Sequence, residues 1–142
     1  MRRRTRSREF ALQVLYEIDI SKESCDTALA NFWQTLCQEE ADQDIKDFTE
    51  DLVRGVAGNL ELIDSIISRH ATNWQLERMP VVDRNVLRLS CYELCFREDI
   101  PPKVSINEAV DLAKKYSEPE AGKFVNAILD QIRLEKNKCP EK

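Results

Sequence analysis

The chain of 142 residues is 42% hydrophobic and 33% charged, with three glycines and a net charge of −5. These values are typical of a globular domain that buries a core without disulfides or metal, and they exclude collagen-like and disordered chains. The sequence has no apolar run long enough to span a bilayer, and its basic amino terminus lacks the apolar segment of a secretory signal. We therefore expect a cytoplasmic protein with no membrane segment.

Charge is distributed unevenly along the chain. The first eight residues, MRRRTRSR, hold five arginines and no acid, so the remainder carries 16 basic against 26 acidic side chains. A basic arm on an acidic body favours local attraction to phosphates, and the planar guanidinium of arginine donates two hydrogen bonds at once. The alternative is a disordered tail that only adds solubility.

Four helices are predicted in the first half of the chain, because apolar residues recur there at helical spacing. The first helix continues from the arginine-rich arm, so Arg8 and Gln13 should lie on its surface beside the arm. The third helix should end near Gly58, where glycine suits a left-handed cap. The four helices are expected at Arg6–Ile20, Cys25–Gln38, about 45–58 and about 60–70.

The stretch Pro80–Phe96 is predicted to be the central helix of the fold. Apolar positions cover more than half of its circumference, so other helices must surround it. Proline suits its first turn, and Pro101-Pro102 prevents it from continuing. A polar break at residues 71–73 precedes this helix. We therefore expect an amino-terminal half of about residues 1–73 and a carboxy-terminal half of about residues 74–142.

Two more helices follow the central one. The sixth should begin at Ser105, because Ser105 and Glu108 have the spacing of a capping box, and the seventh carries apolar residues from Phe124 to Ile132. Strand-like alternation does not persist anywhere in the sequence. The prediction is an all-α single domain of about seven helices.

Metal binding and catalysis have little support in the sequence. Cys91 and Cys95 share a helix face, but zinc sites usually need three or four ligands, and the chain has a single histidine, His70. Two buried core cysteines are the favoured interpretation. The sequence also lacks a glycine-rich phosphate loop and a nucleophile elbow. We expect no metal, no cofactor and no enzyme activity.

Four segments together carry a resemblance to a known family: RSREFALQVLYEID, NWQLERMPVVDRNVLRLSCYEL, PPKVSINEAVDLAKKYS and KFVNAILD. In this order they resemble the NusB family of bacterial transcription antitermination factors. The resemblance implies two small helical bundles and no enzyme activity. It also implies binding to the boxA element of ribosomal RNA leader transcripts with NusE, a small-subunit ribosomal protein. The complex would join the antitermination assembly of RNA polymerase and support processive ribosomal RNA transcription.

The resemblance further implies which residues make contact. Glu118 and Glu120, just before Lys123, would weaken attraction to phosphate there, and Phe124 has core spacing as well as a place where a base would stack. The residues matched to RNA binding are Arg4, Arg6, Arg8, Gln13, Lys123 and Phe124, and those matched to NusE binding are Tyr16, Glu77 and Asp83.

Two alternatives differ in class from an antitermination factor. One is an accessory RNA-binding domain related to those fused to ribosomal RNA cytosine methyltransferases, and the other is an adaptor that binds only proteins. Loss of RNA binding with retained partner binding would separate RNA binding from a pure adaptor role. A homodimer that hides the partner surface is also compatible with the sequence.

Overall fold

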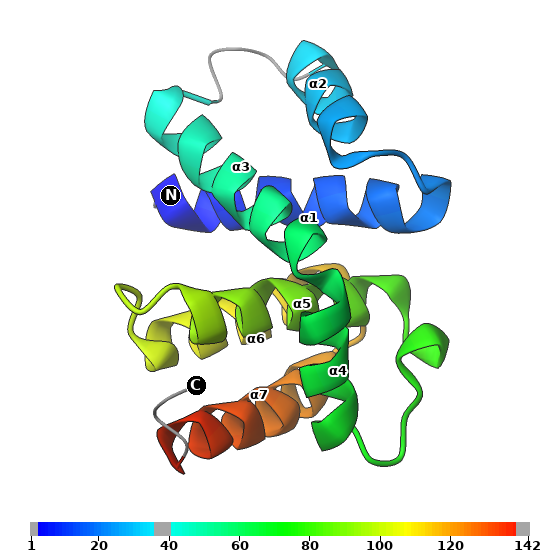
Figure 1. The fold of residues 1–142 in the computed structure, drawn as a ribbon, viewed down its shortest axis with the longest axis vertical. Coiled ribbons are helices and arrows are strands. Elements are labelled where there is room, and N and C mark those ends of the chain that lie inside the picture. Colours follow the sequence, from blue (N-terminus) through cyan, green and yellow to red (C-terminus); the bar gives the residue numbers. More distant parts are fainter. Residues whose placement is uncertain (1–2, 36–40, 139–142) are drawn as a thin grey trace. The chain divides into compact units, whose positions relative to one another are not determined.

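The computed structural model describes residues 3–35 and 41–138, and every regular element in these ranges is helical (Figure 1). This confirms the predicted all-α class. No helix of the described ranges is long and apolar enough to cross a membrane. The elements are α1 (Arg3–Ser21), α2 (Cys25–Thr35), α3 (Gln43–Gly58), α4 (Leu60–His70), the short 3-10 helix η2 (Leu76–Arg78), α5 (Val81–Phe96), α6 (Pro102–Tyr116) and α7 (Ala121–Lys138).

The chain forms two compact units, Met1–Gly58 and Asn59–Lys142. The division therefore falls earlier than the boundary near residue 73 that the sequence suggested. The difference is α4, whose fully buried Ile63 and Ile67 belong to a helix that packs on α5 and α7. The polar break after α4 is a turn inside the second unit, in which the Trp74 N–H donates to the Ala71 carbonyl over 3.0 Å.

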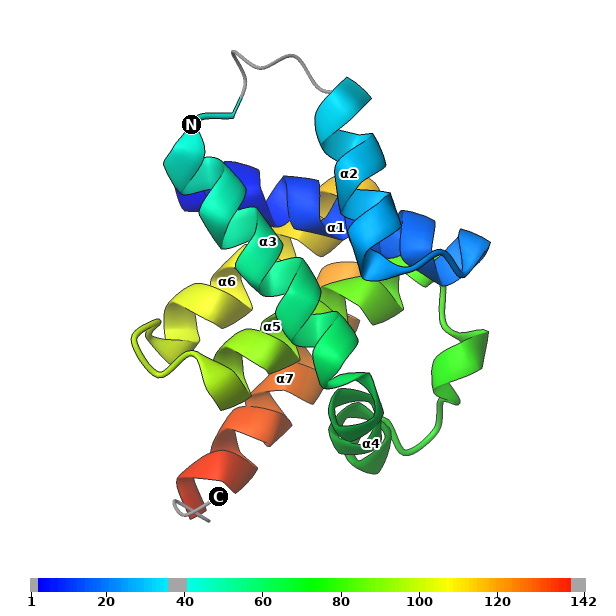
Figure 2. The same cartoon turned by 45° about the horizontal axis from the view of Figure 1, so that its top comes forward.

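In the first unit, α3 crosses α1 in both views (Figures 1 and 2). Small buried side chains allow this close approach. Ser7 Oγ donates to the Ile45 carbonyl oxygen over 3.0 Å, and Thr49 Oγ1 donates to the Ser7 carbonyl oxygen over 3.4 Å. These bonds hold the amino-terminal part of α1, and therefore its arginines, in a fixed place on α3.

An aromatic cluster joins α1 to α2 in the same unit. The Phe10 ring meets the rings of Phe32 and Trp33 edge to face, at centroid distances of 5.4 and 6.2 Å. Trp33 Nε1 donates to Glu50 on α3 over 2.9 Å. Phe32 and Trp33 of α2 are thus half-buried and packed against α1 and α3.

Several predicted helix boundaries are corrected. The first helix begins at Arg3 and not at Arg6, so the arginines from Arg3 onward are helical. Gly58 ends α3 without a left-handed conformation. Asp42 caps that helix by accepting a hydrogen bond from the Ile45 N–H over 3.1 Å. The predicted end of the second helix, residues 36–38, lies outside the described residues, as do Cys37 and Cys139.

In the second unit, α5 contacts α4, α6 and α7, and most of its side chains are buried. This is the surrounded helix that its apolar circumference predicted. Pro80 precedes the first helical residue, Val81, where a missing N–H costs nothing. The core includes the fully buried Leu87 and Leu89 of α5 together with Leu129 and Ile132 of α7.

The capping-box prediction for Ser105 is wrong. Helix α6 begins at Pro102, one turn earlier, because proline is well suited to a first helical position. Ser105 lies inside the helix and is buried, and its Oγ donates to Glu93 Oε1 on α5 over 2.7 Å. Ser90 Oγ in turn donates to the Ser105 carbonyl over 3.2 Å. Ser105 therefore joins two helices by a buried polar contact.

We expect Ser105→Ala to lower the free energy of unfolding by about 1–3 kcal/mol, because a buried carboxylate loses a charge-assisted hydrogen bond. Chemical denaturation followed by circular dichroism measures the change. Ser65→Ala on the exposed side of α4 is the matched control, with an expected change within about 0.5 kcal/mol. Equal stability of both variants would contradict the role assigned to Ser105.

An ion pair joins α4 to α5 on the same unit. Arg88 Nε donates to Asp64 Oδ1 over 2.8 Å, and Arg88 Nη2 donates to Asp64 Oδ2 over 3.0 Å. The Arg88 side chain is largely buried, and Arg88 Nη1 also donates to Asn85 Oδ1 over 3.2 Å. Such a bidentate pair fixes the orientation of both side chains as well as the spacing of the helices.

Candidate nucleic-acid interface

The arginines of α1 pack on aromatic rings of the first unit. The guanidinium carbons of Arg4 and Arg8 lie 4.3 and 5.4 Å from the centroid of the Phe48 ring on α3. That of Arg6 lies 4.4 Å from the Phe10 ring. Cation–π contacts of this kind hold the guanidinium groups in place. Binding of a phosphate would therefore cost less side-chain entropy than on a flexible arm.

Two arginines of α1, Arg3 and Arg6, are paired with acidic side chains. Arg3 forms an ion pair with Asp42, and Arg6 Nη1 donates to the buried Glu9 over 2.8 Å. The backbone N–H of Ile45, together with the Arg3 guanidinium, holds the pKa of Asp42 below its ordinary value. Among the described residues Arg4 forms no ion pair and its side chain is exposed, so it offers the most available positive charge of this face.

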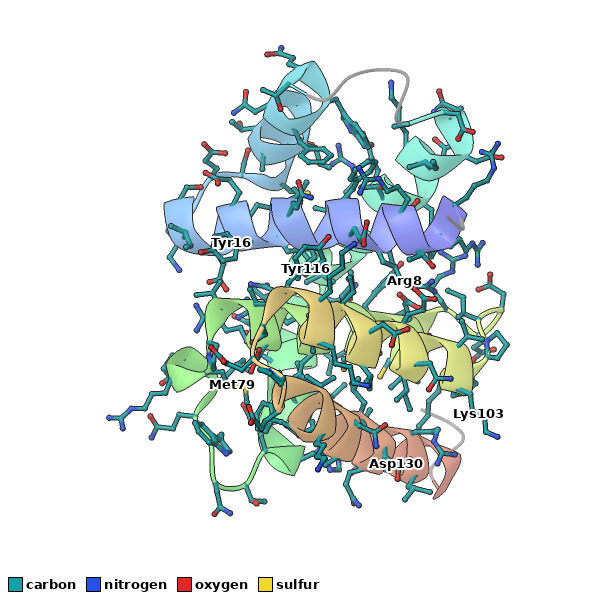
Figure 3. All side chains as sticks on the ribbon, turned by 180° about the vertical axis from the view of Figure 1, so that it is seen from behind. Arg8, Tyr16, Met79, Lys103, Tyr116 and Asp130 are labelled. Carbon is teal, nitrogen blue, oxygen red and sulfur yellow. The ribbon has the colours of Figure 1, made fainter. Side chains whose placement is uncertain are left out.

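The exposure of the predicted residues on α1 differs along the helix. Arg8 is only 3% exposed, so the prediction that it stays on the surface is wrong, whereas Gln13 is exposed as predicted. The position of Arg8 next to Phe48 explains the difference, because its long apolar stem can pack in the core beside the ring. Figure 3 shows Arg8 nearer the amino-terminal end of α1 and Tyr16 farther along the helix.

A second group of predicted residues lies at the start of α7 in the second unit. Lys123 is exposed and Phe124 is half-buried. The Phe124 ring meets Trp74 edge to face, with centroids 5.7 Å apart and planes inclined by 70°. Glu118 and Glu120, which precede α7, are exposed as well. Phe124 therefore has both a packing partner and some open surface, and its stacking role remains a prediction.

The three residues matched to a protein partner differ in accessibility. Tyr16 is 41% exposed and Glu77 is exposed, but Asp83 is only 6% exposed. Asp83 Oδ1 is buried and has no hydrogen-bond partner. A protein that docks on this chain can reach Tyr16 and Glu77 directly. Asp83 would need to become more accessible before it could make the same kind of contact.

Glu77 is held by an arginine of α5. Arg84 Nη1 lies 3.3, 3.2 and 3.4 Å from the carbonyl oxygens of Leu76, Glu77 and Met79 and donates toward them. One guanidinium thus fixes the whole of η2, which ends next to Met79, labelled in Figure 3. The Glu77 carboxylate is consequently presented from a rigid backbone.

The cysteines of α5 do not form a metal site within the described residues. No group of three or more histidine, cysteine or acidic side chains in these ranges is arranged to hold a metal ion. Cys91 is buried, and a hydrogen bond with Cys95 together with burial raises the pKa of its thiol well above the ordinary value. Cys91 is therefore a core cysteine as predicted, whereas Cys95 is only half-buried.

The structure thus brings Arg4 and Arg8 together on Phe48 and places Arg6 on Phe10 in the same unit, while Lys123 and Phe124 are neighbours on the other unit. Sequence reasoning missed two aromatic residues of these groups. Neither Phe48 nor Trp74 was among the residues that the sequence assigned to these groups. Helical spacing gives no signal for either contact, because each joins residues that are far apart in the sequence.

A cationic helix end on an otherwise acidic, all-helical chain is typical of proteins that bind nucleic acid locally. Sequence and structure comparisons define the family. This chain belongs to the NusB family, whose sequence model matches residues 5–133.

Individual relatives agree with that assignment. The chain is 50% identical over 130 residues to the transcription antitermination protein NusB of Anaeromyxobacter dehalogenans, covering 92% of this chain and 89% of the relative. Its structure is similar to T. maritima NusB, with a TM-score of 0.85, 40% identity and coverage of 95% and 92% of the two chains. It is also similar to a chain in a crystal structure of the antitermination factors NusB and NusE with double-stranded RNA, with a TM-score of 0.85, 33% identity and coverage of 95% and 98%.

Proposed function

We propose that this chain is a transcription antitermination factor that binds boxA-type RNA of ribosomal RNA leader transcripts together with NusE. It would act in the cytoplasm as part of the RNA polymerase antitermination complex, and would do so by binding, without a catalytic step. The observation that carries the proposal is the arginine-rich start of α1, where the guanidinium groups of Arg4 and Arg6 pack on the rings of Phe48 and Phe10.

Within this proposal, the two groups of residues have different tasks. Arg4 and Arg6, with Gln13 on the same helix, bind phosphates, and Arg8 positions Phe48 beneath Arg4. Lys123 binds a further phosphate from the second unit, and the Phe124 ring stacks on a base. Phosphate contacts supply most of the affinity, whereas contacts with unstacked bases supply sequence preference.

The direct test is fluorescence anisotropy of a labelled boxA RNA titrated with this chain, with and without NusE. A scrambled RNA of the same composition is the control. We expect tighter binding to boxA than to the scrambled RNA, and a further gain when NusE is present. Equal affinity for both RNAs would show an unspecific polyanion binder, and no binding at all would contradict the proposed function.

For the partner surface, Glu77→Lys is expected to weaken NusE binding about fivefold or more, because the new positive charge, on a backbone held by Arg84, repels a basic ribosomal protein. Isothermal titration calorimetry measures this affinity. Glu61→Lys, an exposed acid in the first turn of α4, is the matched control with the same change in net charge. If both reversals change the affinity equally, Glu77 is not part of the interface.

A further inference from the structure

Trp74 is a large aromatic residue that the second unit leaves in contact with solvent. Trp74 is 52% exposed and lies in the short connection between α4 and η2. The ring is nevertheless held in place. Its backbone N–H is bonded to Ala71, and its ring packs against Phe124.

An ordered and exposed aromatic ring is suited to stacking. A nucleobase placed on such a ring gains contact area without a large loss of side-chain entropy, because tryptophan has only two side-chain torsions and one end of the ring is already packed. Lys123 next to Phe124 is exposed and gives this surface a positive charge for the neighbouring phosphate.

The inclination between the two rings defines the form of RNA that fits. The planes of Trp74 and Phe124 differ by 70°, so bases that lie flat on them cannot be stacked on one another. Successive bases of a double helix are nearly parallel, whereas those of a single strand can be splayed apart. The aromatic pair therefore favours a single strand over a duplex.

We propose that Trp74 is a base-stacking residue, which with Phe124 holds two unstacked nucleotides of single-stranded RNA. This inference rests on the proposed function, because it assigns a further residue to the RNA surface of the second unit. It differs from that proposal in naming a residue outside the predicted set and a strand form for the bound segment.

The experiment compares Trp74→Leu, Trp74→Phe and the wild-type chain in binding to single-stranded boxA RNA. We expect the leucine variant to bind roughly 5- to 150-fold more weakly, the value for one stacked base, with an unchanged salt slope. The phenylalanine variant retains a ring and should recover most of the affinity. The control is Phe96→Leu, because Phe96 is 40% exposed and stacks on Tyr92 at the carboxy-terminal end of α5.

A second measurement needs no substitution in the chain under test. The full chain labelled with 5-fluorotryptophan has two fluorine resonances, from Trp33 and Trp74, which the Trp74→Phe variant assigns. We expect single-stranded boxA RNA to shift the Trp74 resonance, and a fully paired duplex of the same sequence to shift it less. This result remains decisive if the leucine variant folds poorly.

The outcomes separate this inference from the proposed function. If the wild-type chain binds boxA RNA but Trp74→Leu binds equally well and the Trp74 resonance does not move, the inference is overturned and the proposed function stands. If Trp74→Leu weakens only NusE binding, the ring contacts protein and the inference is also overturned. If the wild-type chain binds no RNA, the proposed function itself fails.

Discussion

Alanine at both Arg4 and Arg6 is expected to weaken binding of boxA RNA roughly tenfold or more, and to flatten its salt dependence by about 1.4 in the log–log slope. Each guanidinium that neutralises a phosphate of a single strand releases counterions, which contributes about 0.7 to that slope. Because phosphate contacts carry no base information, affinity should fall in similar proportion for boxA and scrambled RNA. Anisotropy titrations at several salt concentrations measure both quantities.

Two further variants serve as controls for this prediction. Arg54→Ala removes an exposed arginine of α3 that is paired with Asp26, and should leave the salt slope unchanged. Arg8→Ala should mainly lower stability, because the Arg8 side chain is buried beside Phe48. A slope that does not respond to loss of Arg4 and Arg6, or that responds equally to loss of Arg54, would contradict the assignment of the RNA surface to this face.

Removal of Arg88 is expected to have the largest effect on stability among the polar contacts. Arg88→Leu breaks the bidentate pair with Asp64 and leaves that carboxylate without its principal cation between α4 and α5. We expect a loss of about 2–4 kcal/mol in the free energy of unfolding, somewhat below the value for a fully buried pair. Urea denaturation monitored by circular dichroism measures it.

The double variant decides whether this loss comes from the pair or from packing. Replacing Asp64 and Arg88 together by leucine removes both charges, so it should recover a large part of the stability lost in Arg88→Leu. Additive losses in the double variant would show that the two side chains do not interact energetically. Binding of RNA at the α1 face of the first unit should be unchanged in all folded variants.

Helix type could be predicted from the sequence, but helix starts could not. The apolar stripe of α5 is strong because it covers most of the helix, and the fold shows it surrounded by α4, α6 and α7. The sequence contains two possible starts for α6, the capping-box spacing of Ser105 and Glu108 and the proline at Pro102. The helix begins at Pro102, because the fixed backbone angle of proline suits a first helical residue. Ser105 therefore lies one turn inside the helix, where it bonds to Glu93.

The sequence predicted the charged residues of the candidate site, but it did not predict the aromatic rings that these residues contact. Composition alone identified the arginine-rich segment, but Phe48, the ring that holds the guanidinium groups of Arg4 and Arg8, comes from α3, forty residues and more along the chain. The burial of Arg8 follows from the same packing against Phe48. The contact of Trp74 with Phe124 could not be predicted for a similar reason, because Phe124 lies on α7 and no local sequence pattern connects the two residues.

The location of the RNA surface is tested most directly by photo-crosslinking. In this experiment boxA RNA that contains 4-thiouridine is crosslinked to the chain, and the crosslinked peptides are identified by mass spectrometry. We expect adducts in the amino-terminal part of α1 and around Trp74 and Phe124, and we expect them to disappear when an excess of unlabelled boxA RNA competes. Specific adducts confined to the acid-rich α3, or to the α4 surface around Glu61, would contradict this expectation.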